Sequence, residues 1–179
     1  MKLLFSSEQI DQRIEELAQE ILRETQGSQP LFVTLLRGSM PFTAKLLFEI
    51  ARQAPDFHPE LDYMTVKTYG DKRRPGEPKI IMDLSPDTVV AGRTVIILDD
   101  VLDKGITSSF VAAALMARDA KHTLLAVLVE KDIVRANQPH ADFACFHAGE
   151  EWLVGMGMDD ASAAKDGYRW LSEINVVET

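Results

Sequence analysis

The 179-residue sequence has one cysteine, Cys145, and no apolar run long enough to cross a bilayer. A single cysteine excludes an internal disulfide framework and suits a reducing compartment. A spanning helix needs about 20 consecutive apolar residues. The first ten residues, MKLLFSSEQI, have too short an apolar stretch for a secretory signal and no small-residue cleavage pattern. We therefore expect a cytoplasmic protein with no membrane partner.

Positive charge is also scarce, because 19 Lys and Arg residues stand against 28 Asp and Glu, for a net charge of −9. Such a surface is a poor match for nucleic acid or an anionic membrane. The sequence has no internal repeat, low-complexity tract or interdomain linker, and its four histidines show no metal-ligand spacing. With 46% hydrophobic residues, its length predicts a single domain, residues 1–179, around one core.

Short apolar runs alternate with helical periodicity along most of the chain. A first helix is expected over residues 7–24, where Ser6 and Gln9 have the spacing of a capping box. A second helix begins near Pro41, and a third spans about 107–119. Strands are expected at 31–36, 61–66, 80–84, 94–98, 123–129 and 142–146, and short strands in the irregular C-terminal third. This alternation indicates βαβ units, hence an α/β fold with a mainly parallel central sheet flanked by helices.

The most informative stretch is TVIILDDVLDKGITSS, residues 94–109. An apolar strand runs into Asp99, Asp100 and Asp103, and Gly105 then turns the chain into an apolar helix. Backbone N–H groups of such a turn and the positive end of the helix bind phosphate without a basic side chain. The neighbouring carboxylates accept hydrogen bonds from vicinal hydroxyls. The pattern predicts a site for a phosphorylated sugar.

Two other predicted strands end in polar sequence of the same kind. RGS follows the strand at 31–36, and EKD follows the strand at 123–129. Ligands of parallel sheets bind beyond the carboxyl ends of the strands. We therefore expect these segments and DDVLDKG to face one crevice.

The order of apolar strand, two acidic residues, two apolar residues and Asp-x-Gly-x-Thr resembles the phosphoribosyl-diphosphate (PRPP) motif of type I phosphoribosyltransferases. The rest of the chain beyond residue 30 resembles the hypoxanthine-guanine phosphoribosyltransferases, in the family's order. The matching segments are TLLRGSMPF (34–42), VKTYGD (66–71), LVEKD (128–132) and EEWLVGMGMDD (150–160). The resemblance implies the type I fold, with a core over about 30–145. It also implies a small hood from the N-terminal segment and about 146–179.

The PRPP motif carries most of the implied roles. Asp99 and Asp100 would bind the ribose hydroxyls, directly or through Mg²⁺, and Asp103 would be the general base. The 5′-phosphate would lie against Lys104, Gly105, Ile106 and Thr107. Lys104 stands where the family commonly has Thr.

The other segments supply the rest of the implied site. Arg37 and Gly38 would contact the leaving diphosphate, and Thr68 and Tyr69 would begin a mobile loop that closes over the substrate. Three residues would bind the purine: Lys131 at its 6-oxo group, Trp152 by stacking and Leu153 through its backbone. Asp159 would approach a second Mg²⁺. Arg169 is the expected partner of the diphosphate, although it lies farther from Asp159 than in the family's usual pattern.

The implied activity is purine salvage, in which hypoxanthine and/or guanine and PRPP give IMP or GMP and pyrophosphate with Mg²⁺. The resemblance also implies a homodimer or homotetramer. Lys131 and Trp152 favour a 6-oxopurine but do not rank hypoxanthine, guanine and xanthine. Two alternatives remain open at this point. One is a transferase that uses xanthine or a pyrimidine, and the other is a phosphoribosyltransferase-fold regulator that binds a nucleotide and nucleic acid, against which the acidic composition argues.

Overall fold

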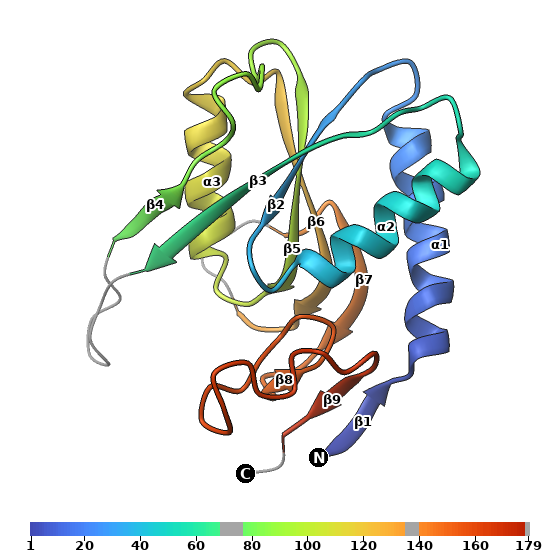
Figure 1. Ribbon diagram of the computed structural model, residues 1–179, viewed down its shortest axis with the longest axis vertical. Helices are drawn as coiled ribbons and strands as arrows, with labels where there is room; N and C mark the ends of the chain where they lie inside the picture. The colour runs from blue at the N-terminus through green and yellow to red at the C-terminus, as the bar shows by residue number, and fades with distance from the viewer. Residues whose placement is uncertain (69–76, 135–139, 178–179) are drawn as a thin grey trace.

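A computed structural model describes residues 1–68, 77–134 and 140–177, excepting the side chain of Thr68. A six-stranded sheet in the order β4-β3-β2-β5-β6-β7 forms the centre (Figure 1). Its strands are β2 (Leu31–Leu35), β3 (Glu60–Thr68), β4 (Pro78–Met82), β5 (Thr94–Leu102), β6 (His122–Lys131) and β7 (Phe143–Ala148). All neighbouring pairs are parallel except β3 and β4. The predicted parallel sheet is confirmed, and the carboxyl ends of β2, β5 and β6 lie at one edge.

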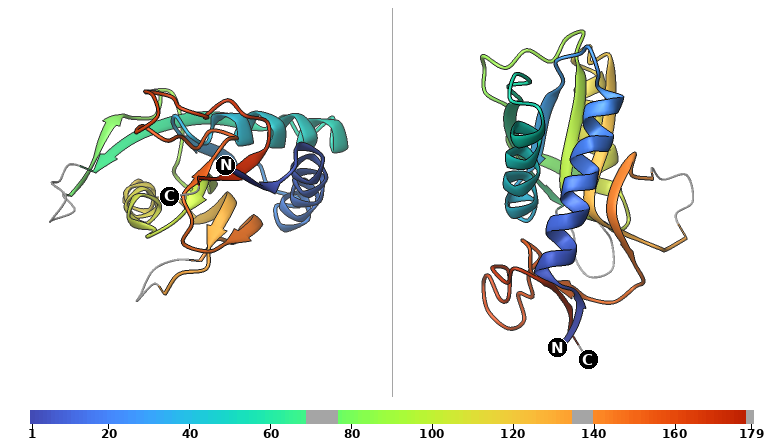
Figure 2. Two further views of the ribbon diagram at one scale, coloured as in Figure 1. Left: turned by 90° about the horizontal axis from the view of Figure 1, so that it is seen from below. Right: turned by 90° about the vertical axis from the view of Figure 1, so that its right-hand side faces the viewer.

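Helices cover both faces of this sheet. The helices α1 (Ser7–Glu24) and α2 (Met40–Gln53) pack on one face, in a cluster that includes Phe32, Ile96 and Leu128. The helix α3 (Ile106–Met116) packs on the other face with Val33 and Ile97. The strand residues of the two clusters alternate because successive strand side chains point to opposite faces. Figure 2 shows α1 and α3 on opposite sides of the strands.

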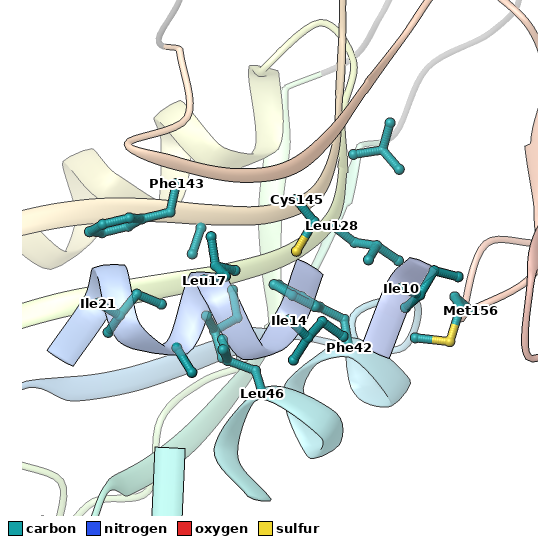
Figure 3. Packing of buried hydrophobic residues seen from close by; sticks show 14 of the residues in the cluster. Ile10, Ile14, Leu17, Ile21, Phe42, Leu46, Leu128, Phe143, Cys145 and Met156 are labelled. Carbon is teal, nitrogen blue, oxygen red and sulfur yellow. The ribbon is translucent and has the colours of Figure 1, made fainter. Parts of the chain in front are cut away.

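The first helix is held at its start and along one face. The predicted capping box is present, since Ser6 Oγ accepts from Gln9 N at 3.3 Å and Gln9 Oε1 accepts from Ser6 N at 2.8 Å. Figure 3 shows its apolar face against the core, and the buried residues are Ile10, Ile14, Leu17, Ala18 and Ile21. α1 also covers the edge strand β7, because Arg13 donates to the carbonyl oxygens of Ala144 (2.9 Å) and Cys145 (3.1 Å). Cys145 is buried there, and burial raises its pKa to about 12.

A second sheet, of three antiparallel strands, joins the two ends of the chain. Its order is β1-β9-β8, where β1 is Lys2–Phe5, β8 is Leu153–Val154 and β9 is Ile174–Val176. Both termini lie beside it (Figure 1). This sheet lies beyond the carboxyl ends of the central strands, at the edge where the predicted site residues gather. Sequence reasoning did not predict β1.

Several predicted boundaries differ by one or two residues, and two were wrong by three residues or more. β5 does not stop at residue 98 but runs to Leu102, so Asp99 and Asp100 lie within the strand. Pairing with β6 continues through Asp99, Val101 and Leu102, although the apolar run has ended. α3 ends at Met116 instead of about residue 119. None of the helices in the described part of the chain is long and apolar enough to cross a membrane.

Candidate active site

The acidic end of β5 carries two adjacent, partly buried carboxylates. Asp99 Oδ1 accepts from Asp100 N at 3.1 Å, and Asp100 Oδ1 accepts from Val101 N at 2.9 Å. Burial, and secondly the negative charge of Asp100, raises the pKa of Asp99 well above its ordinary value. Burial also raises the pKa of Asp100. When both carboxylates are ionised, a bound cation would offset their mutual repulsion.

The residues present fit Mg²⁺ better than a metal held only by protein. No group of three or more His, Cys, Asp or Glu side chains in the described ranges is arranged to enclose a metal ion. Mg²⁺ is usually bound by one or two carboxylates, together with waters and substrate phosphate oxygens. Asp99 and Asp100 match that requirement.

The turn after β5 encloses a cavity of about 210 Å³. Gly105 lies in the left-handed region (φ 72°), where glycine is favoured, and immediately precedes α3. Ser108 Oγ donates to Gly105 O at 3.2 Å and steadies the turn. Four residues expected at the 5′-phosphate line this cavity together: Lys104, Gly105, Ile106 and Thr107. The cavity therefore opens onto backbone N–H groups at a helix N-terminus.

A second cavity, of about 220 Å³, brings together residues far apart in the sequence. Lys131 is buried at the end of β6, and Trp152, with 58% of its surface exposed, forms part of the wall. The remaining lining residues are Asp100, Val101, Asp103, Leu153, Met158 and Asp159. Asp103 and Val101 line both cavities. Asp103 is thus the one carboxylate in the lining that the two cavities share.

The RGS turn after β2 packs tightly against the acidic strand end. A Cβ added to Gly38 would lie 1.9 Å from Asp100 Oδ2, so a larger residue there would displace the Asp100 carboxylate. Buried hydroxyls anchor the turn, since Thr34 Oγ1 lies 2.7 Å from Ser39 Oγ and 2.6 Å from Thr43 Oγ1. The Leu36–Arg37 peptide bond is cis.

Gly157 presses on the other side of this turn. It has φ 105°, and a Cβ there would lie 1.7 Å from Gly38 O. Arg169 holds Gly157 in place, because Gly157 N donates to Arg169 O at 3.0 Å and Arg169 Nη1 donates to Gly157 O. Three segments are thereby stacked: the end of β5, the RGS turn and the chain around Gly157.

Arg37 and Arg169 come together despite the long spacing after Asp159. Arg169 is buried and pairs through Nη2 with Asp159 Oδ1 at 2.7 Å. Its Nε pairs with Asp166 Oδ1 at 3.0 Å, and Arg37 Nη2 reaches the same oxygen at 3.3 Å. Sequence reasoning did not single out Asp166, because it lies in an irregular loop that has no periodic pattern. It also assigned no site role to Val101 or Met158, whose apolar side chains carry no chemical signal.

The expected mobile-loop residues are only partly described. Thr68 ends β3, and only its backbone is described. Tyr69 lies outside the described residues. All the other predicted site residues lie at the carboxyl edge of the central sheet or on the chain that covers it.

Comparisons with known proteins agree with this arrangement. The phosphoribosyl transferase domain family matches residues 4–161. The hypoxanthine-guanine phosphoribosyltransferases of Bacillus subtilis and Streptococcus thermophilus are each 36% identical over 178 residues, which is 99% of this chain and 93% of each relative. A hypoxanthine phosphoribosyltransferase structure from Staphylococcus aureus superposes with a TM-score of 0.87 at 26% identity, covering 99% of this chain and 91% of that one. The expected type I fold is confirmed, and the chain belongs to the hypoxanthine-guanine phosphoribosyltransferase family.

Proposed function

We propose that this enzyme converts hypoxanthine and/or guanine and PRPP to IMP and/or GMP and pyrophosphate, in a Mg²⁺-dependent purine salvage reaction. The observation that carries the proposal is the position of Asp103 between two cavities. One cavity presents the phosphate-binding turn, and the other presents Lys131 and Trp152. A sugar phosphate and a purine, one in each cavity, would meet at this carboxylate.

The end of β5 and the turn after it bind PRPP. The backbone from Lys104 to Thr107 holds the 5′-phosphate, and Asp99 and Asp100 accept hydrogen bonds from the ribose hydroxyls. Asp99 and Asp100 would hold Mg²⁺, and Asp159 would hold a second ion; the metal would supply charge stabilisation for the departing diphosphate. The negative strand end also favours the positive charge that develops on the ribose.

The second cavity selects the base. Trp152 stacks on the purine, the Leu153 backbone contacts its edge, and the Lys131 ammonium donates to the 6-oxo group. Adenine has an amino group at that position and offers no acceptor, so a 6-oxopurine is preferred. Asp103 accepts the proton that the imidazole nitrogen loses as it attacks C1 of the ribose.

The RGS turn binds the departing diphosphate. Arg37 and the Gly38 backbone contact it, and Arg169 adds a second guanidinium beside them.

The whole chain acts as one domain in this proposal, with a core over about 30–145 and a hood from the two terminal segments. We also infer a cytoplasmic homodimer or homotetramer. Large apolar side chains left in solvent on α2 and β3 support self-association: Phe48, Leu61 and Tyr63. Sedimentation velocity at micromolar concentration tests this, and a monomer would contradict it.

The activity is tested by incubating pure protein with PRPP, Mg²⁺ and one base at a time, and by resolving the nucleotides formed. Hypoxanthine and guanine should give IMP and GMP, and adenine should give no AMP. Specificity constants for hypoxanthine, guanine, xanthine and uracil then rank the acceptors. Absence of IMP and GMP in every condition would refute the proposal.

A further inference from the structure

Two arginines converge on one carboxylate oxygen at the proposed diphosphate position. Asp166 Oδ1 lies 3.0 Å from Arg169 Nε and 3.3 Å from Arg37 Nη2. Two guanidinium groups this close repel each other unless an anion lies between them. Asp166 supplies that anion from within the chain.

Asp166 lies in the loop at 160–167, which is closed by hydrogen bonds between its own residues. Asp160 N donates to Gly167 O at 3.0 Å, and Gly167 N donates to Ala164 O at 3.0 Å. Asp160 Oδ1 accepts from both the backbone N (2.9 Å) and the hydroxyl (2.6 Å) of Ser162. A Cβ on Gly167 would lie 2.6 Å from Asp160 O, so the closure needs glycine. The Asp166 carboxylate is therefore held at a defined place.

The two arginines are bound unequally. Arg169 exposes 7% of its side chain and has Asp159 and Gly157 O as further partners. Arg37 exposes 61% of its side chain. Exposed ion pairs contribute little to stability, so Arg37 separates easily from Asp166, whereas Arg169 stays in place.

We propose that Asp166 is an internal counter-anion that lowers the affinity of this enzyme for pyrophosphate. The inference rests on the proposed function, which puts diphosphate beside these arginines. A diphosphate oxygen needs the N–H donors that Asp166 occupies, and its several negative charges are repelled by a carboxylate a few ångströms away. That repulsion outweighs the small loss of order when one exposed ion pair is removed. Asp166 thereby speeds product release.

The test is titration calorimetry of the full-length protein with pyrophosphate at fixed, saturating Mg²⁺. Asp166→Asn keeps the shape of the side chain and removes its charge, and it should lower the Kd of pyrophosphate roughly three- to tenfold, about 0.7–1.4 kcal/mol. The KM for PRPP should fall in parallel, while the KM for hypoxanthine stays unchanged. Asp166→Glu retains the charge and should restore the wild-type Kd. Asp87→Asn makes the same charge change at an exposed carboxylate outside the site and should leave the Kd unchanged.

The sign of the effect separates this proposal from a structural role. If Asp166 only orders the loop, Asp166→Asn would weaken pyrophosphate binding and lower the Tm. Weaker or unchanged binding in Asp166→Asn, or equal tightening in Asp87→Asn, overturns the proposal. Failure of the proposed function would show separately, because wild-type protein would then make neither IMP nor GMP. Pyrophosphate binding itself is measured without a base.

Discussion

Asp103 borders both cavities of the site, whereas Asp99 and Asp100 each border only one. Asp103→Asn removes the proton acceptor but leaves the phosphate-binding turn intact. We expect kcat to fall by about 10²–10⁴-fold, the usual contribution of a general base, with the KM for PRPP little changed. Steady-state kinetics with hypoxanthine measure both quantities. Asp87→Asn, an exposed carboxylate outside the site, is the control. Unchanged turnover in Asp103→Asn would remove this residue from the mechanism.

Trp152 leaves most of its indole in solvent, although large aromatic side chains are usually covered. Stacking of a base on an aromatic side chain contributes about 1–3 kcal/mol. Trp152→Ala should therefore raise the KM for hypoxanthine roughly tenfold or more, without a comparable change in the KM for PRPP. Trp170→Ala removes another exposed indole, which lines neither cavity, and should leave both constants near wild type. Equal effects from the two variants would argue against stacking at Trp152.

Gly157 is confined both by its backbone angle and by its neighbour. Gly157→Ala places a Cβ 1.7 Å from Gly38 O, so the RGS turn must move away. We expect kcat/KM for PRPP to fall at least about tenfold, since a displacement near 1 Å at a catalytic site costs up to 10²-fold. Gly27→Ala is the matched control, because Gly27 also has positive φ but meets nothing within 4 Å. It should lose stability but keep full activity. A Gly157→Ala enzyme with normal kinetics would contradict the packing described.

At the scale of elements, the first helix was predicted most completely. Its apolar period and its capping box are both local signals, and the helix occupies Ser7–Glu24 as expected. β5 was predicted too short, because the apolar run stops at Leu98 while backbone pairing with β6 goes on. Backbone pairing does not depend on apolar side chains, and those of Asp99 and Asp100 line the two cavities. β1 was missed because its partner β9 lies at the opposite end of the chain.

Ser6 begins α1 through reciprocal hydrogen bonds with Gln9. Ser6→Ala removes one of the two bonds and should lower the free energy of unfolding by about 1 kcal/mol. Urea denaturation followed by circular dichroism measures the change. Ser7→Ala, one residue farther along the chain, should change stability by much less. If both substitutions have the same cost, the capping box contributes nothing specific.

At the scale of the whole molecule, the two acidic side chains at the end of β5 lower the free energy of unfolding of the unliganded protein at neutral pH. The pKa values of Asp99 and Asp100 are raised in the folded state, so the folded protein binds more protons than the unfolded chain. Protonation of this pair stabilises the folded protein at acid pH. That stabilisation is lost as the pH rises above the ordinary carboxyl pKa and then through the raised pKa values of the pair. Sites that are tuned for function commonly carry such a cost.

Asp99→Asn should therefore stabilise the unliganded protein at neutral pH, by about 0.5–2 kcal/mol, while it weakens PRPP binding. The gain should shrink as the pH is lowered toward 4, because wild-type Asp99 is then protonated as well. Chemical denaturation at a series of pH values measures the difference. Asp87→Asn should show no such dependence. A stability difference that is constant with pH would mean that the Asp99 pKa is not raised.

The site as a whole follows from topology more than from any single residue. Parallel order brings the ends of β2, β5 and β6 to one edge, which is why Arg37, Asp103 and Lys131 were predicted together. The approach of Arg169 to Arg37 was not predictable, because it depends on how the loop at 160–167 closes. Backbone bonds within an irregular loop leave no periodic pattern in the sequence. Asp166 was missed for the same reason.

Because of its position, Cys145 can report when α1 separates from β7. This thiol is the chain's only one, and it lies in the core on an edge strand that α1 clamps through Arg13. A thiol reagent modifies the thiolate and must first reach the sulfur. The labelling rate at this residue therefore depends on how often α1 separates from β7. The rate at which this sulfur reacts would report how often α1 and β7 separate while catalysis proceeds at the carboxyl ends of the strands.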